Sequence, residues 1–311
     1  MNKRVGVRDL AKKKTKTKKE YYDFKAFVDG KATSAKIWDI SQVLKNGDII
    51  DCEVTEDSYK GKKQFIARDY SIVTESVEKE ERATIFGVVE VSGEDLLSEI
   101  ANIVKKNVKD TIVQNLIIGM LSENEQSFIS SVAARSNHHN YKGGLISHTL
   151  NVLKICLEVG KLYENINMDI LVAGAILHDI GKIKTYTHIN EDTIEYTERG
   201  HFYEHLVYGS MMVRDCWKTM GEAEDDIRLS LISHCILSHH GEREWGSPVK
   251  PVCKEAQILH LADMIDSRIG IMDSQVREYD GENNFTDMCY NLGSSIYIGE
   301  NNVWRVCGIR R

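Results

Sequence analysis

The sequence predicts an α+β multidomain fold in which a small N-terminal β-barrel precedes an all-α helical bundle. The chain has 311 residues, which is enough for two hydrophobic cores. β-Branched and aromatic segments broken by turn-forming residues fall within residues 20–75. From residue 92 onward, apolar residues recur at helical three- and four-residue spacing, and the chain contains only two prolines.

The composition predicts a cytoplasmic, globular protein. Hydrophobic residues make up 42% of the chain and charged residues 28%. No apolar stretch approaches the ~20 residues of a membrane span, and the first ten residues lack the apolar core of a signal peptide. The seven cysteines form no CxxC pair, so we interpret them as buried free thiols in a reducing compartment. The sequence leaves a homo-oligomer open.

Positive charge is concentrated at the N-terminus. Residues 1–70 contain 17 Lys/Arg and 11 Asp/Glu, a net charge of +6, whereas the whole chain carries −7. This asymmetry suggests that one end of the protein meets a polyanion. We expect residues 1–19, which include most of "AKKKTKTKKE", to be a basic flexible arm. Such an arm is either a solvated tail or a segment that contacts phosphates.

Residues 20–90 are expected to form an OB-like barrel that binds nucleic acid. Aromatic residues alternate there with lysines, which is typical of a groove that stacks single-stranded bases. The simpler interpretation is that half of these aromatic residues form the barrel core. The candidate binding residues in this segment are Trp38, Tyr59, Lys60, Lys62 and Lys63.

Residues 91–282 are expected to form the helical domain, because helix-length apolar segments follow one another between Gly, Asn, Asp and Pro signals. The pattern weakens afterwards, and residues 283–311 are treated as a C-terminal tail with some β-strand character.

Five histidines lie within or at the ends of apolar helical segments: His148, His178, His205, His239 and His240. One histidine on an apolar face is usually a core residue, but five favour a metal site between helices. The carboxylate of Asp179 has two oxygens and can bridge two cations, and Asp263 can complete the set. Imidazole and carboxylate ligands without thiolates suit manganese, iron, cobalt or zinc.

Lys182 follows one helical turn after His178. It is either a lysine favoured by the dipole at a helix C-terminus or a cation that stabilises charge on a phosphoryl group. Spacing alone predicts a metal site and does not specify the reaction.

The order of these residues resembles the HD-domain metal-dependent phosphohydrolase superfamily. The surrounding segments are similar to the YhaM-type 3′–5′ exoribonuclease family of bacteria. The motifs that carry this resemblance are "HHNYKGGLISHTLNVL" (138–153), "AGAILHDIGK" (173–182) and "LSHHGEREWGSPVKPVCKEAQILHLADMIDSR" (237–268). The resemblance covers residues 20–280 and implies an OB-type domain followed by an HD domain, where "AKIWD" (35–39) and "YKGKKQFIA" (59–67) fall in the OB part.

The resemblance implies two divalent metal ions, with Mn²⁺ expected first and Co²⁺, Fe²⁺ or Zn²⁺ as alternatives. One ion would be held by His148, His178, Asp179 and Asp263, and the other by Asp179, His205, His239 and His240. Lys182 would face the scissile phosphate, so Lys182 and Asp179 are the catalytic candidates.

The remaining site candidates lie around this set. His260 would orient Asp263, and His234 would pack behind the ligands. His139 would line the substrate entrance, and Trp245 would either stack on a terminal base or plug its own loop.

The resemblance implies a metal-dependent 3′–5′ exoribonuclease that hydrolyses single-stranded RNA to nucleoside 5′-monophosphates, with single-stranded DNA as an optional further substrate. One alternative is an HD-type nucleotide or cyclic-dinucleotide phosphohydrolase, which would leave the basic β domain unexplained. A second alternative is a non-catalytic nucleic-acid-binding protein, against which the complete ligand set argues.

Overall fold

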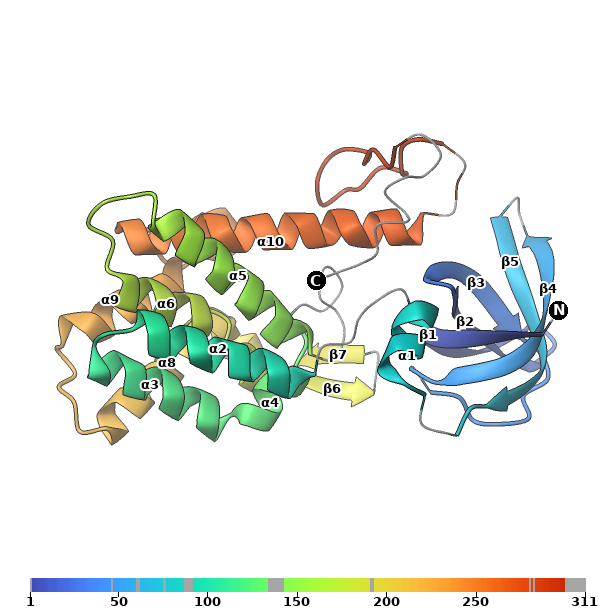
Figure 1. Cartoon of the computed structure of the whole chain (residues 1–311), viewed down its shortest axis with the longest axis horizontal. Helices are drawn as coiled ribbons and strands as arrows, with labels where there is room; N and C mark the ends of the chain where they lie inside the picture. Colours follow the sequence, from blue (N-terminus) through green and yellow to red (C-terminus); the bar gives the residue numbers. More distant parts are fainter. Residues whose placement is uncertain are drawn as a thin grey trace. The chain divides into compact units, whose positions relative to one another are not determined.

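The computed structural model describes residues 2–299 except 46, 60–61, 75–76, 87–91, 134–142, 191–192, 280 and 282. The chain divides into two units, residues 91–271 and the remainder. Figure 1 shows a strand-rich unit at the N-terminal end of the chain and a helical unit after it. The predicted fold class is confirmed.

The first unit contains a closed five-stranded, OB-like barrel. Its strands are β1 (Asn2–Lys14), β2 (Glu20–Val28), β3 (Lys31–Ile37), β4 (Ile49–Tyr59) and β5 (Lys62–Ile72). Their order is β1-β2-β3-β5-β4, and pairing of β1 with β4 closes the barrel. All neighbouring strands are antiparallel except β3 and β5. A short helix, α1 (Lys79–Phe86), follows, and the Phe86 ring lies where a side chain at Gly6 would be.

The expectation of a flexible arm over residues 1–19 is wrong, because β1 is an integral barrel strand. Val5 and Val7 alternate into the core, and β1 pairs with both β2 and β4. The lysines that suggested a solvated arm are largely paired with carboxylates, including Lys13 with Asp23. The other such pairs are Lys12 and Lys14 with Glu20, and Lys19 with Asp39.

The second unit is a helical bundle. Its elements are α2 (Gly93–Asn107), α3 (Thr111–Glu123), α4 (Glu125–Ser130), α5 (Gly144–Gly160), α6 (Met168–Leu177), α7 (Lys182–Thr185), β6 (Tyr186–Asn190), β7 (Thr193–Tyr196), α8 (Glu198–Thr219), α9 (Ile227–Ser238), a 3₁₀ turn (Arg243–Trp245) and α10 (Lys254–Glu278). The strands β6 and β7 form an antiparallel hairpin between α7 and α8.

The central helix of the bundle is α6, in which every residue from Ile170 to Leu177 is buried. The side chain of Asn167 begins the helix by accepting hydrogen bonds from the amides of Asp169 and Ile170. Because α6 is surrounded by other helices, its sequence is apolar on all sides. The residues that follow Leu177, His178 and Asp179, therefore lie in the interior of the bundle.

The described part of the C-terminal segment has little regular structure. Two isolated bridges, Phe285 with Tyr297 and Cys289 with Ser294, fold residues 285–297 back on themselves. Within the described residues, none of the helices is both long and apolar enough to cross a lipid bilayer.

Candidate metal centre

The site is built where α6 and α9 end together. Gly174 lies against the side chain of Cys235, where an added Cβ atom would be 2.8 Å from the Cβ of Cys235. His178 and His239 each follow this contact by four residues, or about one helical turn. Their imidazole rings consequently meet with centroids 4.9 Å apart.

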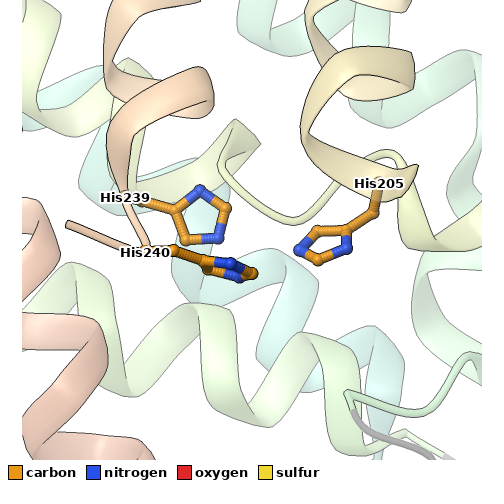
Figure 2. Close-up of side chains that lie close together, drawn as sticks. All are labelled: His205, His239 and His240. Atoms are coloured by element: carbon orange, nitrogen blue, oxygen red, sulfur yellow. The ribbon is translucent and has the colours of Figure 1, made fainter. Parts of the chain in front are cut away.

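All seven predicted ligand residues converge on this point. Three groups have ligand atoms within 4.8 Å of one another. They are His148, His178 and Asp263; His205, His239 and His240; and His178, Asp179 and His239. Figure 2 shows the second group, with His239 and His240 at the end of α9 and His205 facing them from α8.

Asp179 lies between the His148–His178–Asp263 group and the His205–His239–His240 group, which we call the outer groups. One of its carboxylate oxygens faces each outer group. Its Oδ2 is 3.4 Å from the Nε2 of His178 and 3.6 Å from that of His148. Its Oδ1 is 3.4 Å from the Nε2 of His205 and 3.7 Å from that of His239. The carboxylate is 2% exposed, so these imidazoles largely define its surroundings.

Four of the five imidazoles are oriented through Nδ1. That atom donates to a backbone carbonyl oxygen in His178 (Ala175), His239 (Ile236) and His240 (Trp245). In His148 the acceptor is the carboxylate of Asp266, at 2.7 Å. A proton on Nδ1 leaves the lone pair of Nε2 free, which is the arrangement of metal-bound histidines.

The electrostatics separate the two groups. Burial lowers the pKa of His205 to about 4 and lowers the pKa values of His239 and His240, so these three are neutral at pH 7. Burial also acts on His148, but Asp263 and Asp266 outweigh it and raise its pKa to about 9. Burial opposes ionisation of Asp179, yet Lys182 and His178 hold its pKa well below the usual range.

The donor set fits divalent metal ions. Asp179 Oδ1 and both ring nitrogens of His205 are buried without a hydrogen-bond partner. Burying such an atom without a hydrogen-bond or metal partner destabilises the fold by about 1–3 kcal/mol. The Nε2 atoms of His148 and His178 are 3.1 Å apart, and facing lone pairs at that distance require a shared cation or proton. An ion in each outer group would satisfy Asp179 Oδ1, the Nε2 of His205 and the facing Nε2 atoms of His148 and His178, and it would leave the Nδ1 of His205 to another partner.

Comparison with known families agrees with this geometry. Residues 145–268 match the family model of the HD domain. The match starts in the first turn of α5, ends within α10 and includes all seven residues. This match suggests a metal-dependent phosphohydrolase, and the His/Asp groups described above could hold divalent ions. No solved structure matches the chain.

Lys182 forms a direct hydrogen bond with the carboxylate of Asp179. Its Nζ donates to Asp179 Oδ2 at 2.6 Å, and its side chain is 12% exposed. From the sequence, Lys182 would share a face with His178 only if the helix continued, but α6 ends at Leu177 and a turn precedes α7. The turn brings the ammonium group of Lys182 back to the carboxylate of Asp179, which lies three residues earlier in the chain.

Gly181 allows the backbone of α8 to approach this turn. A Cβ atom at Gly181 would be 2.1 Å from the carbonyl oxygen of His205 and 2.8 Å from the amide nitrogen of Gly209. A side chain at this position would push His205 away from Asp179. The sequence alone did not distinguish this role from that of a helix end.

Asp266 is the functional candidate that the sequence analysis missed. Besides orienting His148, it accepts a hydrogen bond from the side chain of Asn151. The available signal was its position three residues after Asp263, which puts both carboxylates on one face of α10.

The two outlying histidines contact backbone groups. His260 Nδ1 donates to the carbonyl oxygen of His239 at 2.8 Å, so the expectation that His260 orients Asp263 is corrected: it supports His239 instead. His234 Nε2 accepts a hydrogen bond from the amide of Val252, which agrees with a packing position.

The nucleic-acid-binding candidates are only partly described. Trp245 is 52% exposed, and its carbonyl oxygen is bonded to the ligand candidate His240. In the barrel, half-buried Trp38 stacks on Tyr21 with ring centroids 4.5 Å apart. His139 and Lys60, and the side chains of Tyr59, Lys62 and Lys63, lie outside the described residues.

Proposed function

We propose that the protein is a metal-dependent 3′–5′ exoribonuclease that hydrolyses single-stranded RNA to nucleoside 5′-monophosphates. The observation that carries the proposal is the position of Asp179, with one oxygen facing each histidine group and Lys182 bonded to it. This arrangement suits cleavage of a phosphodiester, in which negative charge must be stabilised on both sides of phosphorus.

The proposal assigns the donors to two ions. His148, His178, Asp179 and Asp263 would hold one, and Asp179, His205, His239 and His240 the other. Two bound divalent ions, Mn²⁺ first among the candidates, would lower the pKa of water and neutralise developing charge. Lys182 adds a fixed positive charge beside Asp179, where a non-bridging phosphate oxygen would gain a charge-assisted hydrogen bond.

The barrel supports a single-stranded nucleic acid as the substrate. An OB-like barrel commonly binds single strands by stacking bases on aromatic rings beside basic residues. The Tyr21–Trp38 pair lies at the edge where Lys19 of the β1–β2 turn contacts Asp39. Lys16 and Lys18 of the same turn are exposed. These groups form the proposed strand-binding edge.

The test is hydrolysis of 5′-labelled single-stranded RNA by purified protein with added Mn²⁺. The proposal predicts a ladder that shortens from the 3′ end, release of nucleoside 5′-monophosphates and no reaction in excess chelator. The Asp179→Asn variant, tested in parallel, should be inactive. Single-stranded DNA of the same sequence would measure the preference between the two polymers.

A nucleotide or cyclic-dinucleotide phosphohydrolase is the second candidate. It is favoured by the pairing of Lys12, Lys13, Lys14 and Lys19 with carboxylates, which reduces the charge available for a polyanion. The same assay with a cyclic dinucleotide and a nucleoside triphosphate separates the two. Intact RNA beside a hydrolysed small molecule would overturn the exoribonuclease proposal, and binding of RNA without any hydrolysis would indicate a non-catalytic protein.

A further inference from the structure

The imidazole of His205 differs from the four others in the site. Each of those has an acceptor for Nδ1, whereas both ring nitrogens of His205 are buried without a hydrogen-bond partner. The carboxylate of the preceding residue, Glu204, is close by. Its Oε2 lies 3.9 Å from the Nδ1 of His205, which is too long for a hydrogen bond but within reach of a side-chain rotation.

The backbone of Glu204 is strained. Its φ of 52° and ψ of 171° interrupt α8 immediately before His205. These angles lie close to a region that glycine alone occupies readily, so a glutamate pays a conformational cost there. Residues other than glycine that keep such conformations concentrate at functional sites, where the surrounding structure holds them.

Close contacts on both sides of Glu204 hold it in this conformation. Before it, Gly200 packs so tightly that an added Cβ atom would be 2.3 Å from the carbonyl oxygen of Thr185. After it, the carbonyl oxygen of His205 lies against Gly181. The chain is therefore fixed against the α6–α7 turn and against the end of α7, and Glu204 absorbs the change of direction between these contacts.

We propose that Glu204 is the positioning residue for His205. Its carboxylate would accept the Nδ1–H hydrogen bond that the other four imidazoles already make, and so keep Nε2 directed at Asp179 Oδ1, 3.4 Å away. The side chain of Glu204 is 54% exposed, which leaves it room to close the gap. The proposal rests on metal binding by the HD domain and is independent of RNA being the substrate.

The experiment compares Glu204→Ala, Glu204→Gln and Glu204→Gly in chelator-stripped protein, with Glu198→Ala in the first turn of α8 as the matched control. Mn²⁺ affinity is measured by calorimetric titration, and the thermal midpoint of the metal-free protein is measured separately. Glu204→Ala should weaken one of two Mn²⁺-binding events by roughly 10–100-fold. Glu204→Gln keeps an acceptor oxygen and should lose less, while Glu198→Ala should match the wild type.

Glu204→Gly separates positioning from folding. It should weaken Mn²⁺ binding as Glu204→Ala does, yet melt a few degrees higher than the wild type because glycine adopts the angles without strain. Wild-type Mn²⁺ affinity in the alanine or glycine variant would overturn the proposal, as would a wild-type protein that takes up no Mn²⁺. If the alanine variant does not fold, the glycine variant decides. Because no RNA is used, failure of the exoribonuclease proposal would leave this result unaffected.

Discussion

The Nδ1 of His148 lies 2.7 Å from Oδ2 of Asp266. The two residues come from α5 and α10, and their contact fixes the imidazole so that its Nε2 is 3.2 Å from Asp263. One helix thus supplies both a ligand candidate and the group that orients another ligand candidate. A carboxylate behind a metal-bound imidazole fixes the ring and raises its basicity.

Replacing Asp266 with alanine should weaken Mn²⁺ binding in the His148 group by roughly 10–100-fold. The measurement is calorimetric titration of stripped protein, with Asp215→Ala on the exposed surface of α8 as the control. Asp266→Asn should lose less, because its amide oxygen still accepts the Nδ1 hydrogen bond. Wild-type affinity in Asp266→Ala would show that the contact does not orient a ligand.

Gly181→Ala should destabilise the fold by about 1–3 kcal/mol or more, because the added methyl group overlaps the backbone of α8. Gly119→Ala is the matched control. There the new Cβ atom meets only the Sγ of Cys216 at an ordinary 3.5 Å, and alanine should stabilise α3 by about 0.5–1 kcal/mol. Urea denaturation measures both changes. Equal stability of the two variants would mean that α8 does not approach the α6–α7 turn as described.

Asp110 should stabilise the helical unit through charge as well as capping. It begins α3 by accepting from the amides of Ile112 and Val113, and it also contacts Arg228. Asp110→Ala should cost about 1–2 kcal/mol. Asp110→Asn keeps a capping oxygen and should cost less.

The contribution of Asp110 should also depend on pH. Burial raises its pKa, but Arg228 and the two amides outweigh burial and lower it. The ionised form therefore stabilises the fold fully above the unfolded value of about 3.9, and this stabilisation is lost as pH falls through the lower folded value. The difference in unfolding free energy between wild type and Asp110→Asn should shrink below pH ~4. A difference that stays constant or grows on acidification would contradict this.

Trp38→Ala should weaken binding of single-stranded RNA by about 1–3 kcal/mol if one base stacks on the Tyr21–Trp38 pair. Fluorescence anisotropy with labelled oligonucleotide in chelator measures binding without hydrolysis. Val43→Ala, which alters an exposed side chain of the same unit, is the control. An unchanged dissociation constant for Trp38→Ala would show that the Tyr21–Trp38 edge does not bind single-stranded RNA.

Local pattern predicted the barrel, the bundle and the order of the ligand candidates, but it failed where distant segments meet. The lysine run after Leu10 concealed the end of a strand that pairs with β2, and the start of the same strand, residues 2–6, pairs with β4 some 45 residues away. The apolar residues of α6 indicated a buried helix, yet the turn before Lys182 depends on Gly181 contacting α8. The strained backbone of Glu204 has no sequence signal, because only contacts on both sides of it impose that conformation.

The central claim is a two-ion centre bridged by Asp179, and the most direct test is the number of ions bound. Stripped wild-type protein titrated with Mn²⁺ should bind two ions per chain, and Asp179→Asn should lose both high-affinity events because the bridge is shared. Asp215→Asn should bind two ions as the wild type does. One ion per wild-type chain, or two ions held with unchanged affinity by Asp179→Asn, would contradict the bridged centre.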